Sequence, residues 1–183
     1  GVLSAMSQDE LPKGIDRERV TQWLAAALPR APPPFAFRLI AAGGSNLTYR
    51  VVDARGDAFI LRRPPVAGAL ATAHDMSREW RIMRALGTQD SGVPVPAMLA
   101  FCADSAVTGA PFYVMERVEG WAGEIRDRRI HHHPPFDQPP YEYGVQYALV
   151  DGIVALANVD HVAVGLGDFG RPDNFLERQV DRW

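Results

Sequence analysis

Three short strand-like runs in the first third of the chain limit its fold most strongly. They span residues 35–41, 47–52 and 58–62. A Gly-Gly-Ser-Asn stretch separates the first two runs, and an Asp-Ala-Arg-Gly-Asp stretch separates the second from the third. Short strands joined by glycine- and aspartate-containing turns are typical of an antiparallel meander. We therefore expect these runs to be consecutive strands of one antiparallel sheet.

Helical patterns lie on either side of these strands. Asp16 is a candidate N-cap for a first helix that runs up to Pro29, and a second helix spans about residues 75–86. Both patterns have apolar residues at helical spacing, which predicts one face packed on a core. These residues are Val20, Trp23, Leu24 and Leu28 in the first helix, and Met76, Trp80, Met83 and Leu86 in the second.

The rest of the chain adds two strands and then becomes mostly helical. The strands span residues 98–102 and 112–118. Residues 126–140 are charged and rich in histidine and proline, which predicts a surface loop. An amphipathic helix follows, then a loop over 165–172 and a short helix that begins near Asp173. The apolar stripe of the amphipathic helix consists of Tyr141, Val145, Leu149, Ile153 and Leu156.

The order of these elements predicts an α+β fold. Three strands, a helix and two strands are the order of a protein-kinase-like small lobe, an antiparallel sheet plus a helix, followed here by the start of a helical large lobe. Other α+β domains share this order, so it does not decide the function. The expected domains are a flexible N-terminus at residues 1–15, a kinase-like N-terminal lobe at 16–118, and a hinge with an incomplete helical C-terminal lobe at 119–183.

Composition excludes some classes of partner. The 183 residues carry a formal net charge of −3, whereas nucleic-acid binders usually show a basic surplus. Cys102 is the single cysteine, which rules out a disulfide framework and fits a reducing cytosol. No apolar run approaches the length of a membrane span. We expect a cytoplasmic protein with neither nucleic acid nor membrane as a partner.

The turn between the first two strands is the first candidate for binding chemistry. It contains Gly43, Gly44, Ser45 and Asn46, and Thr48 follows in the next strand. A kinase needs a tight turn here so that backbone N–H groups close over nucleotide phosphates, and glycines allow that approach. Ser45 and Thr48 add hydroxyl donors. The alternative is an ordinary hairpin turn, because Gly-Gly and Ser-Asn are common turn residues.

A cation and a carboxylate form the second candidate. Arg62 ends the third strand, where kinases present a cation to the α- and β-phosphates, although that cation is usually lysine. Glu79 lies in the following helix, where kinases place the carboxylate that pairs with this cation. The alternatives are a solvated basic strand end for Arg62 and a surface ion pair for Glu79, which is flanked by Arg78 and Arg81.

The strand that begins at Phe112 is the candidate hinge. It runs into Gly120, as a kinase hinge does, and adenine is read there by the backbone C=O near Glu116 and the N–H near Val118. Met115 is expected at the back of the pocket, where a thioether suits a flat base. The alternative is a core strand with Met115 as filler. These three candidates occur in the order and approximate spacing that a kinase small lobe requires.

Two other motifs are expected to be structural. Asp168-Phe169-Gly170 matches the metal-binding tripeptide of protein kinases, but the catalytic Asp and metal-binding Asn that precede it there are missing. The histidines of the run 131–133 point in different directions and have no Cys or carboxylate at clear ligand spacing. We therefore assign no catalytic residue and no metal ligand within this chain.

Several segments carry a resemblance to a known family. They are residues 43–49, 61–65, 78–81 and 111–116, together with the most distinctive, 164–172, which leads into 176–179. Over residues 16–183 the chain resembles the aminoglycoside phosphotransferase and choline kinase-like superfamily. It looks closest to the branch found beside, or fused to, acyl-CoA dehydrogenases.

The resemblance implies ATP bound between two lobes, with Mg²⁺ holding the phosphates in the complete enzyme. It assigns phosphate contact to Ser45 and Asn46, the strand cation to Arg62, its partner to Glu79, and the adenine hinge to Glu116 and Val118. The implied acceptors are small hydroxyl compounds, with hydroxyacyl-CoA species among them. In this branch Asp168-Phe169-Gly170 precedes the catalytic loop and is not the metal site.

The chain departs from the family in one respect. Family members continue to a His-Gly-Asp catalytic loop and a metal-binding Asp, and neither motif occurs here. The first hypothesis is an ATP-dependent small-molecule phosphotransferase present as its nucleotide-binding portion, which is inactive alone. The alternative is a truncated, non-catalytic kinase-like module that binds nucleotide or a protein. An exposed stripe at 145–156 is then expected to drive self-association or binding of a partner, such as an acyl-CoA dehydrogenase.

Overall fold

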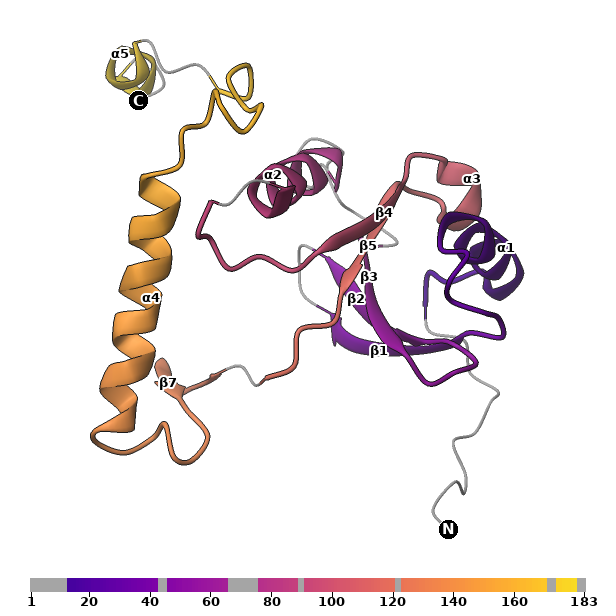
Figure 1. Ribbon diagram of the computed structural model, residues 1–183, viewed down its shortest axis with the longest axis horizontal. Helices are drawn as coiled ribbons and strands as arrows, with labels where there is room; N and C mark the ends of the chain where they lie inside the picture. The colour runs from indigo at the N-terminus through magenta and orange to yellow at the C-terminus, as the bar shows by residue number, and fades with distance from the viewer. Residues whose placement is uncertain are drawn as a thin grey trace. The chain divides into compact units, whose positions relative to one another are not determined.

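The computed structural model describes residues 13–42, 46–65, 76–88, 91–120, 123–170 and 174–180. The chain divides into two compact units, one made of Gly1–Met83 and Pro96–Val118 and the other of Arg84–Val95 and Glu119–Trp183. Figure 1 shows the elements of both. The predicted starts of the second helix near Asp75 and of the last helix near Asp173 lie outside the described residues.

The first unit contains the predicted antiparallel sheet. Its strands are β1 (Ala36–Ala42), β2 (Leu47–Val52), β3 (Ala58–Arg63), β4 (Met98–Cys102) and β5 (Phe112–Glu116). They lie in the order β1-β2-β3-β5-β4, and every neighbouring pair is antiparallel. The meander over β1, β2 and β3 is therefore confirmed. The last strand is shorter than predicted, because pairing ends at Glu116 rather than Val118.

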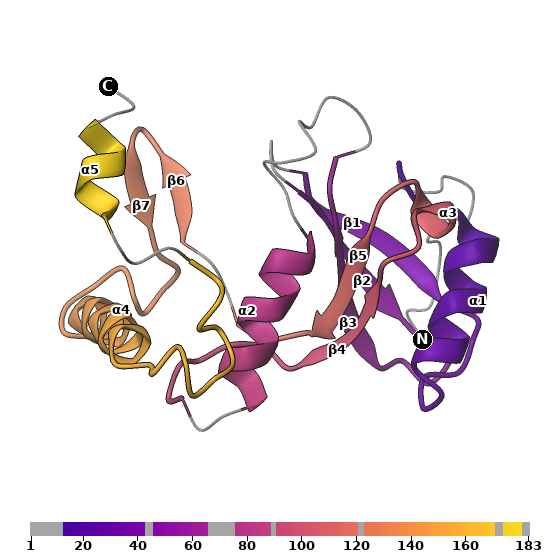
Figure 2. The ribbon, with the colours of Figure 1, turned by 90° about the horizontal axis from the view of Figure 1, so that it is seen from above.

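Two helices cover the opposite faces of this sheet (Figure 2). Helix α1 (Arg17–Ala27) begins as predicted at Asp16, whose side chain accepts a hydrogen bond from the backbone N–H of Arg19. Helix α2 (Met76–Thr88) follows β3 and carries Glu79 in its first turn. A short helix, α3 (Ser105–Thr108), connects β4 and β5 and ends at Gly109, whose φ of 87° is a left-handed conformation suited to glycine.

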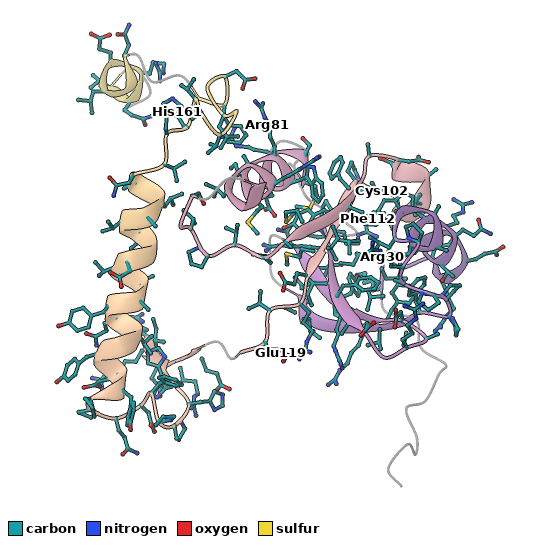
Figure 3. The ribbon with its side chains drawn as sticks, in the orientation of Figure 1. Arg30, Arg81, Cys102, Phe112, Glu119 and His161 are labelled. Atoms are coloured by element: carbon teal, nitrogen blue, oxygen red, sulfur yellow. The ribbon has the colours of Figure 1, made fainter. Side chains whose placement is uncertain are left out.

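The hydrophobic core lies between α1 and the sheet. It contains Val20 and Leu24 of α1, which pack with alternate residues of the inner strands. Phe112 and Cys102 are partners across β5 and β4, and both are buried on this side (Figure 3). The Trp23 and Phe112 rings meet edge to face, with centroids 4.8 Å apart. The other face of the sheet, toward α2, is thereby left for polar residues.

Asp53 organises the turn between β2 and β3. Its buried carboxylate oxygen Oδ1 accepts hydrogen bonds from the backbone N–H groups of Arg55 and Asp57, each at 2.9 Å. We expect Asp53→Ala to lower the free energy of unfolding by about 2 kcal/mol, because two charge-assisted hydrogen bonds are lost. Urea denaturation followed by circular dichroism measures this change. Asp57→Ala, in the same turn, keeps both bonds, and an equal loss in that variant contradicts the assignment.

The second unit contains a hairpin that the sequence did not predict. Strands β6 (Glu124–Arg126) and β7 (Arg129–His131) pair antiparallel. The expectation of a surface loop over 126–140 is therefore wrong for its first residues. The two turn residues, Asp127 and Arg128, have φ of 53° and 60°. A two-residue turn with both φ values positive usually contains Asn-Gly or Asp-Gly, so Asp-Arg gave no turn signal.

The remaining helices are α4 (Tyr141–Ala157) and α5 (Phe175–Val180). The stripe predicted on α4 is largely exposed: Leu149 is 66% exposed, and Ile153 and Leu156 are also exposed, whereas Val145 is half-buried. Within the described residues, no helix has both the length and the apolar character required to span a membrane.

Candidate functional site

The end of β3 directs two neighbouring arginines to opposite faces of the sheet, since successive residues of a strand alternate. Arg63 is only 2% exposed and donates to the backbone carbonyls of Gly14 and Thr108, on the α1 side. Arg62 instead reaches Glu79 of α2. The candidate site therefore lies on the α2 face of the first unit.

Glu79 is the residue on which this site converges. Its oxygen Oε2 accepts a hydrogen bond of 2.9 Å from the Tyr113 hydroxyl and lies 3.7 Å from Nε of Arg62. Its other oxygen, Oε1, accepts a hydrogen bond of 3.2 Å from the side-chain amide of Asn46. The three partners come from the turn before β2, from β3 and from β5. The predicted Arg62–Glu79 pair is thus present, and two neutral donors accompany it.

The ion pair by itself does not fix this arrangement. The side chains of Arg62 and Glu79 are 36% and 37% exposed, and exposed pairs contribute at most about 1 kcal/mol. Hydrogen bonds to an ionised carboxylate are stronger and more directional. The orientation of Glu79 is therefore set by Tyr113 and Asn46. A guanidinium has five N–H donors, so Arg62 keeps donors for a further anion.

Tyr113 is suited to a permanent donor role. Its side chain is nearly fully buried in β5. Burial raises the pKa of the Tyr113 hydroxyl well above its usual value; the Arg62 cation opposes this shift, and the Glu79 carboxylate adds to it. The hydroxyl consequently stays protonated at neutral pH and donates to Glu79 throughout.

Asn46 is joined to α2 by a hydrogen bond. The predicted residues Gly43, Gly44 and Ser45 lie outside the described residues, and Asn46 directly follows them. Asn46 is buried, and one of its amide hydrogens is used by Glu79. Its oxygen Oδ1 has no partner within the described part of the chain, but phosphate oxygens are acceptors and do not bond to it. Phosphate contact through the second amide hydrogen stays a prediction.

The other strand residue of the predicted site lies beside the cation. Thr48, on β2, is half-buried and is the register partner of Arg62 on β3. Antiparallel register partners project their side chains on the same face of a sheet. Thr48 is therefore on the face that carries Arg62 and Glu79.

The hinge residues lie where β5 leaves the sheet. Met115 is half-buried and pairs with Ile60 of β3. The N–H of Glu116 donates to the Ala97 carbonyl at 2.8 Å, and the Glu116 carboxylate accepts from the N–H of Ala97 at 3.1 Å. Glu116 thus fastens the hinge to the segment before β4. Val118 is 66% exposed, and its N–H has no hydrogen-bond partner among the described residues.

The two motifs expected to be structural lie in the second unit. Phe169 donates its backbone N–H to the Leu166 carbonyl at 3.0 Å, so Asp168-Phe169-Gly170 lies in a turn. His131 ends β7, and His132 and His133 follow it. Across the described ranges, no three His, Cys, Asp or Glu side chains come together to hold a metal ion.

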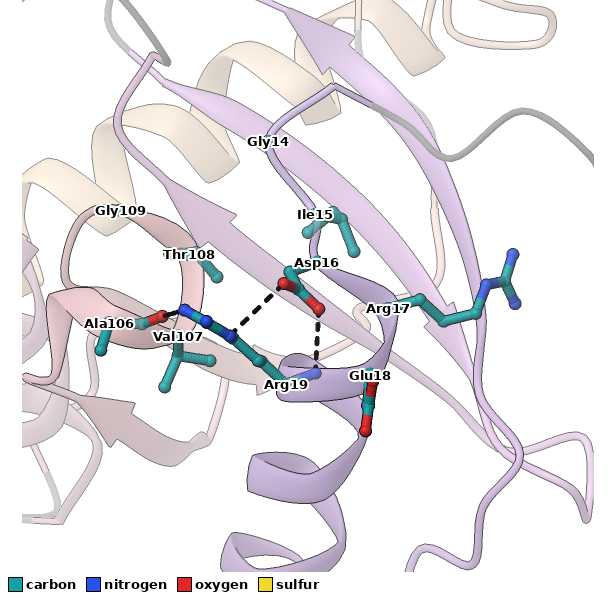
Figure 4. A pocket seen from close by; sticks show the side chains of 10 residues that line it. All are labelled: Gly14, Ile15, Asp16, Arg17, Glu18, Arg19, Ala106, Val107, Thr108 and Gly109. Atoms are coloured by element: carbon teal, nitrogen blue, oxygen red, sulfur yellow. Dashed lines mark hydrogen bonds and ion pairs between the residues drawn. The ribbon is translucent and has the colours of Figure 1, made fainter.

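A cavity of about 630 Å³ lies on the Arg63 side of the sheet, between the start of α1 and α3 (Figure 4). Arg19 reaches across it, donating to the Ala106 carbonyl at 2.7 Å and pairing with Asp16 at 3.5 Å. Arg19 and Asp16 therefore satisfy each other's charge in this cavity. No predicted site residue lines it.

Tyr113 is the site residue that the sequence reasoning missed. Its signal was available in the alternation of β5, because Phe112 and Val114 share one face and Tyr113 and Met115 share the other. A buried tyrosine needs a partner for its hydroxyl. That partner, Glu79, is 34 residues away in sequence, so the pair emerges only from the fold.

The chain matches known proteins along most of its length. The profile of a family described as phosphotransferase enzymes matches residues 36–183. The probable acyl-CoA dehydrogenase IBR3 of Arabidopsis thaliana is 33% identical over 163 residues, which cover 86% of this chain and 19% of that protein. Acyl-CoA dehydrogenase family member 11 of Gallus gallus is 30% identical over 172 residues, which cover 92% of this chain and 21% of that protein.

A solved structure shares the fold. It belongs to a protein of Ralstonia eutropha that carries the provisional name aminoglycoside phosphotransferase. The TM-score is 0.67 at 32% sequence identity, and the match covers 92% of this chain and 46% of the other. The predicted kinase-like α+β fold is confirmed. This chain spans about half of that structure and about a fifth of the curated relatives named above.

Proposed function

Because the chain belongs to the phosphotransferase enzyme family, we propose that it binds ATP and supplies the nucleotide-binding portion of an enzyme that phosphorylates a hydroxyl group of a small molecule. The observation that carries the proposal is the Arg62–Glu79 pair on the α2 face of the sheet. Kinases use such a pair to hold the α- and β-phosphates. The family match also confirms the superfamily and the acyl-CoA dehydrogenase branch expected from the sequence.

The described residues offer hydrogen-bond donors for both ends of a nucleotide, the phosphates and the adenine. Arg62 retains N–H donors for the phosphates, while Glu79 restrains its guanidinium. At the hinge, the N–H of Val118 has no partner among the described residues and is a donor for adenine. Met115 would line the back of the base pocket. We assign Mg²⁺ to the complete enzyme only, where it would neutralise phosphate charge.

The acceptor is proposed from the relatives. Those named above carry acyl-CoA dehydrogenase names, which supports an acyl-CoA with a hydroxyl group as the acceptor. In the reaction, the acceptor oxygen bonds to the γ-phosphorus, the bond from that phosphorus to ADP breaks, and a base takes the hydroxyl proton. No residue of this chain is assigned as that base, since the family's His-Gly-Asp motif does not occur in it. A reducing cytoplasm suits the buried thiol of Cys102.

Calorimetric titration of the 183-residue chain with ATP and with adenosine tests the proposal. We expect ATP to bind about 30-fold more tightly, since charge-assisted contacts from Arg62 to the phosphates contribute about 1.5–3 kcal/mol beyond the binding of the base. The difference should shrink as the salt concentration rises, because salt screens charges at a partly exposed site. Equal affinities, or no binding of ATP, would show that the site does not recognise nucleotide phosphates.

A further inference from the structure

We propose that Tyr113 is a positioning residue for phosphate recognition, because its hydroxyl holds the Glu79 carboxylate in the orientation that restrains Arg62. The proposal rests on the proposed function and adds a residue that neither the sequence pattern nor the Arg–Glu pair assigns. The proposed role acts through Glu79 and requires no contact between Tyr113 and the nucleotide.

The first support is the identity of the Glu79 carboxylate oxygen that Tyr113 binds. Its hydroxyl donates to Oε2 of Glu79, which is also the oxygen that faces Nε of Arg62. Asn46 binds the other oxygen, Oε1. Both oxygens are therefore held, and the carboxylate cannot rotate about its last bond without breaking a hydrogen bond. Without the hydroxyl, Oε2 is free to turn toward solvent, since more than a third of the Glu79 side chain is exposed.

The second support is that the fold leaves the Tyr113 hydroxyl little freedom. Tyr113 and Arg62 are register partners on β5 and β3, so their side chains leave the sheet side by side. The Tyr113 ring lies 6.4 Å from the Trp80 ring, which in turn stacks on Phe101 at 5.7 Å. Trp80 is the residue after Glu79 in α2. The aromatic contacts thus fix the distance between β5 and the turn of α2 that carries the carboxylate.

If Tyr113 served only in packing, removing its hydroxyl would give a different result. Packing against Trp80 needs only the ring, which phenylalanine also supplies, whereas orienting Glu79 needs the hydroxyl. The effect of removing the hydroxyl should therefore fall on phosphate affinity more than on stability. It should also depend on Glu79, since the hydroxyl donates to the Glu79 carboxylate.

The experiment is a double-mutant cycle on the 183-residue chain with Tyr113→Phe and Glu79→Gln, titrated with ATP and with adenosine. We expect Tyr113→Phe to weaken ATP binding about 5- to 10-fold, a part of the contribution of Arg62, and to leave adenosine affinity unchanged. In the Glu79→Gln background the same substitution should change ATP affinity less than about 2-fold. Urea denaturation of each variant shows that it is folded at the titration temperature.

Tyr49→Phe is the matched control. Tyr49 is equally buried, lies on β2, and donates its hydroxyl to the Lys13 carbonyl on the α1 side. We expect it to leave the ratio of ATP to adenosine affinity unchanged. A second variant, Glu79→Asp, withdraws the carboxylate from an unaltered Tyr113 and should reproduce the loss of ATP affinity.

The outcomes separate this inference from the proposed function. If the wild-type chain binds ATP more tightly than adenosine and Tyr113→Phe matches wild type, the positioning role is wrong and the proposed function stands. An equal loss in the wild-type and Glu79→Gln backgrounds also overturns it, because the hydroxyl then does not act through Glu79. If the wild-type chain binds ATP no better than adenosine, the proposed function fails, and this inference with it.

Discussion

Replacing Arg63 with methionine is expected to lower the free energy of unfolding by about 3 kcal/mol. The guanidinium is buried and donates to three backbone carbonyls, those of Gly14, Pro64 and Thr108. Gly14 precedes α1, and Thr108 ends α3. One side chain therefore fastens both segments to the end of β3, and its loss leaves partly buried carbonyls without a donor. Urea denaturation followed by circular dichroism measures the change.

Burial lowers the pKa of the Arg63 guanidinium, an effect that the Tyr49 hydroxyl opposes. Tyr49 also fastens the segment before α1, because its hydroxyl donates to the carbonyl of Lys13. Arg38→Met is the control, since Arg38 is an exposed residue of β1, and its loss should change stability by less than about 0.5 kcal/mol. An Arg63→Met variant as stable as Arg38→Met would show that the buried bonds contribute nothing.

Replacing the adjacent Arg62 with methionine should instead lower ATP affinity and leave stability nearly unchanged. We expect ATP affinity to fall about 30-fold, because the cation that contacts the phosphates is lost. Adenosine affinity should stay the same, and stability should change by less than about 1 kcal/mol, since the lost ion pair is partly exposed. Calorimetry with both ligands and urea denaturation measure these three quantities on one preparation.

Arg62→Lys tests the geometry of this contact. Lysine keeps the charge but lacks the planar fork of donors and has a different reach, so we expect it to restore only part of the ATP affinity. Arg38→Met again serves as the control for loss of a positive charge on the same sheet. A 30-fold loss in that control would attribute the effect to net charge and not to the position of Arg62.

The sequence predicted most of the first unit because its signals are local. The Asp16 cap, the turn between β2 and β3, and the boundaries of β2 and β4 depend on residues within a few positions of one another. The same reasoning failed for the β6–β7 hairpin, whose Asp127-Arg128 turn lacks the glycine that marks such turns. It also gave too long a last strand, because pairing in the sheet ends at Glu116, whose N–H and carboxylate both bond with Ala97.

The site shows the same division between local and distant information. The sequence by itself determined that an arginine ends β3, that a glutamate lies in the first turn of α2, and that their order suits a kinase small lobe. It also determined that Arg62 and Arg63 face opposite sides, since strands alternate. The sequence named Arg62 as the partner of Glu79, and the tertiary structure makes the contact because α1 and α2 cover opposite faces. Tyr113 and Asn46 reach Glu79 for the same reason: register and packing, and not spacing along the chain, bring them to one carboxylate.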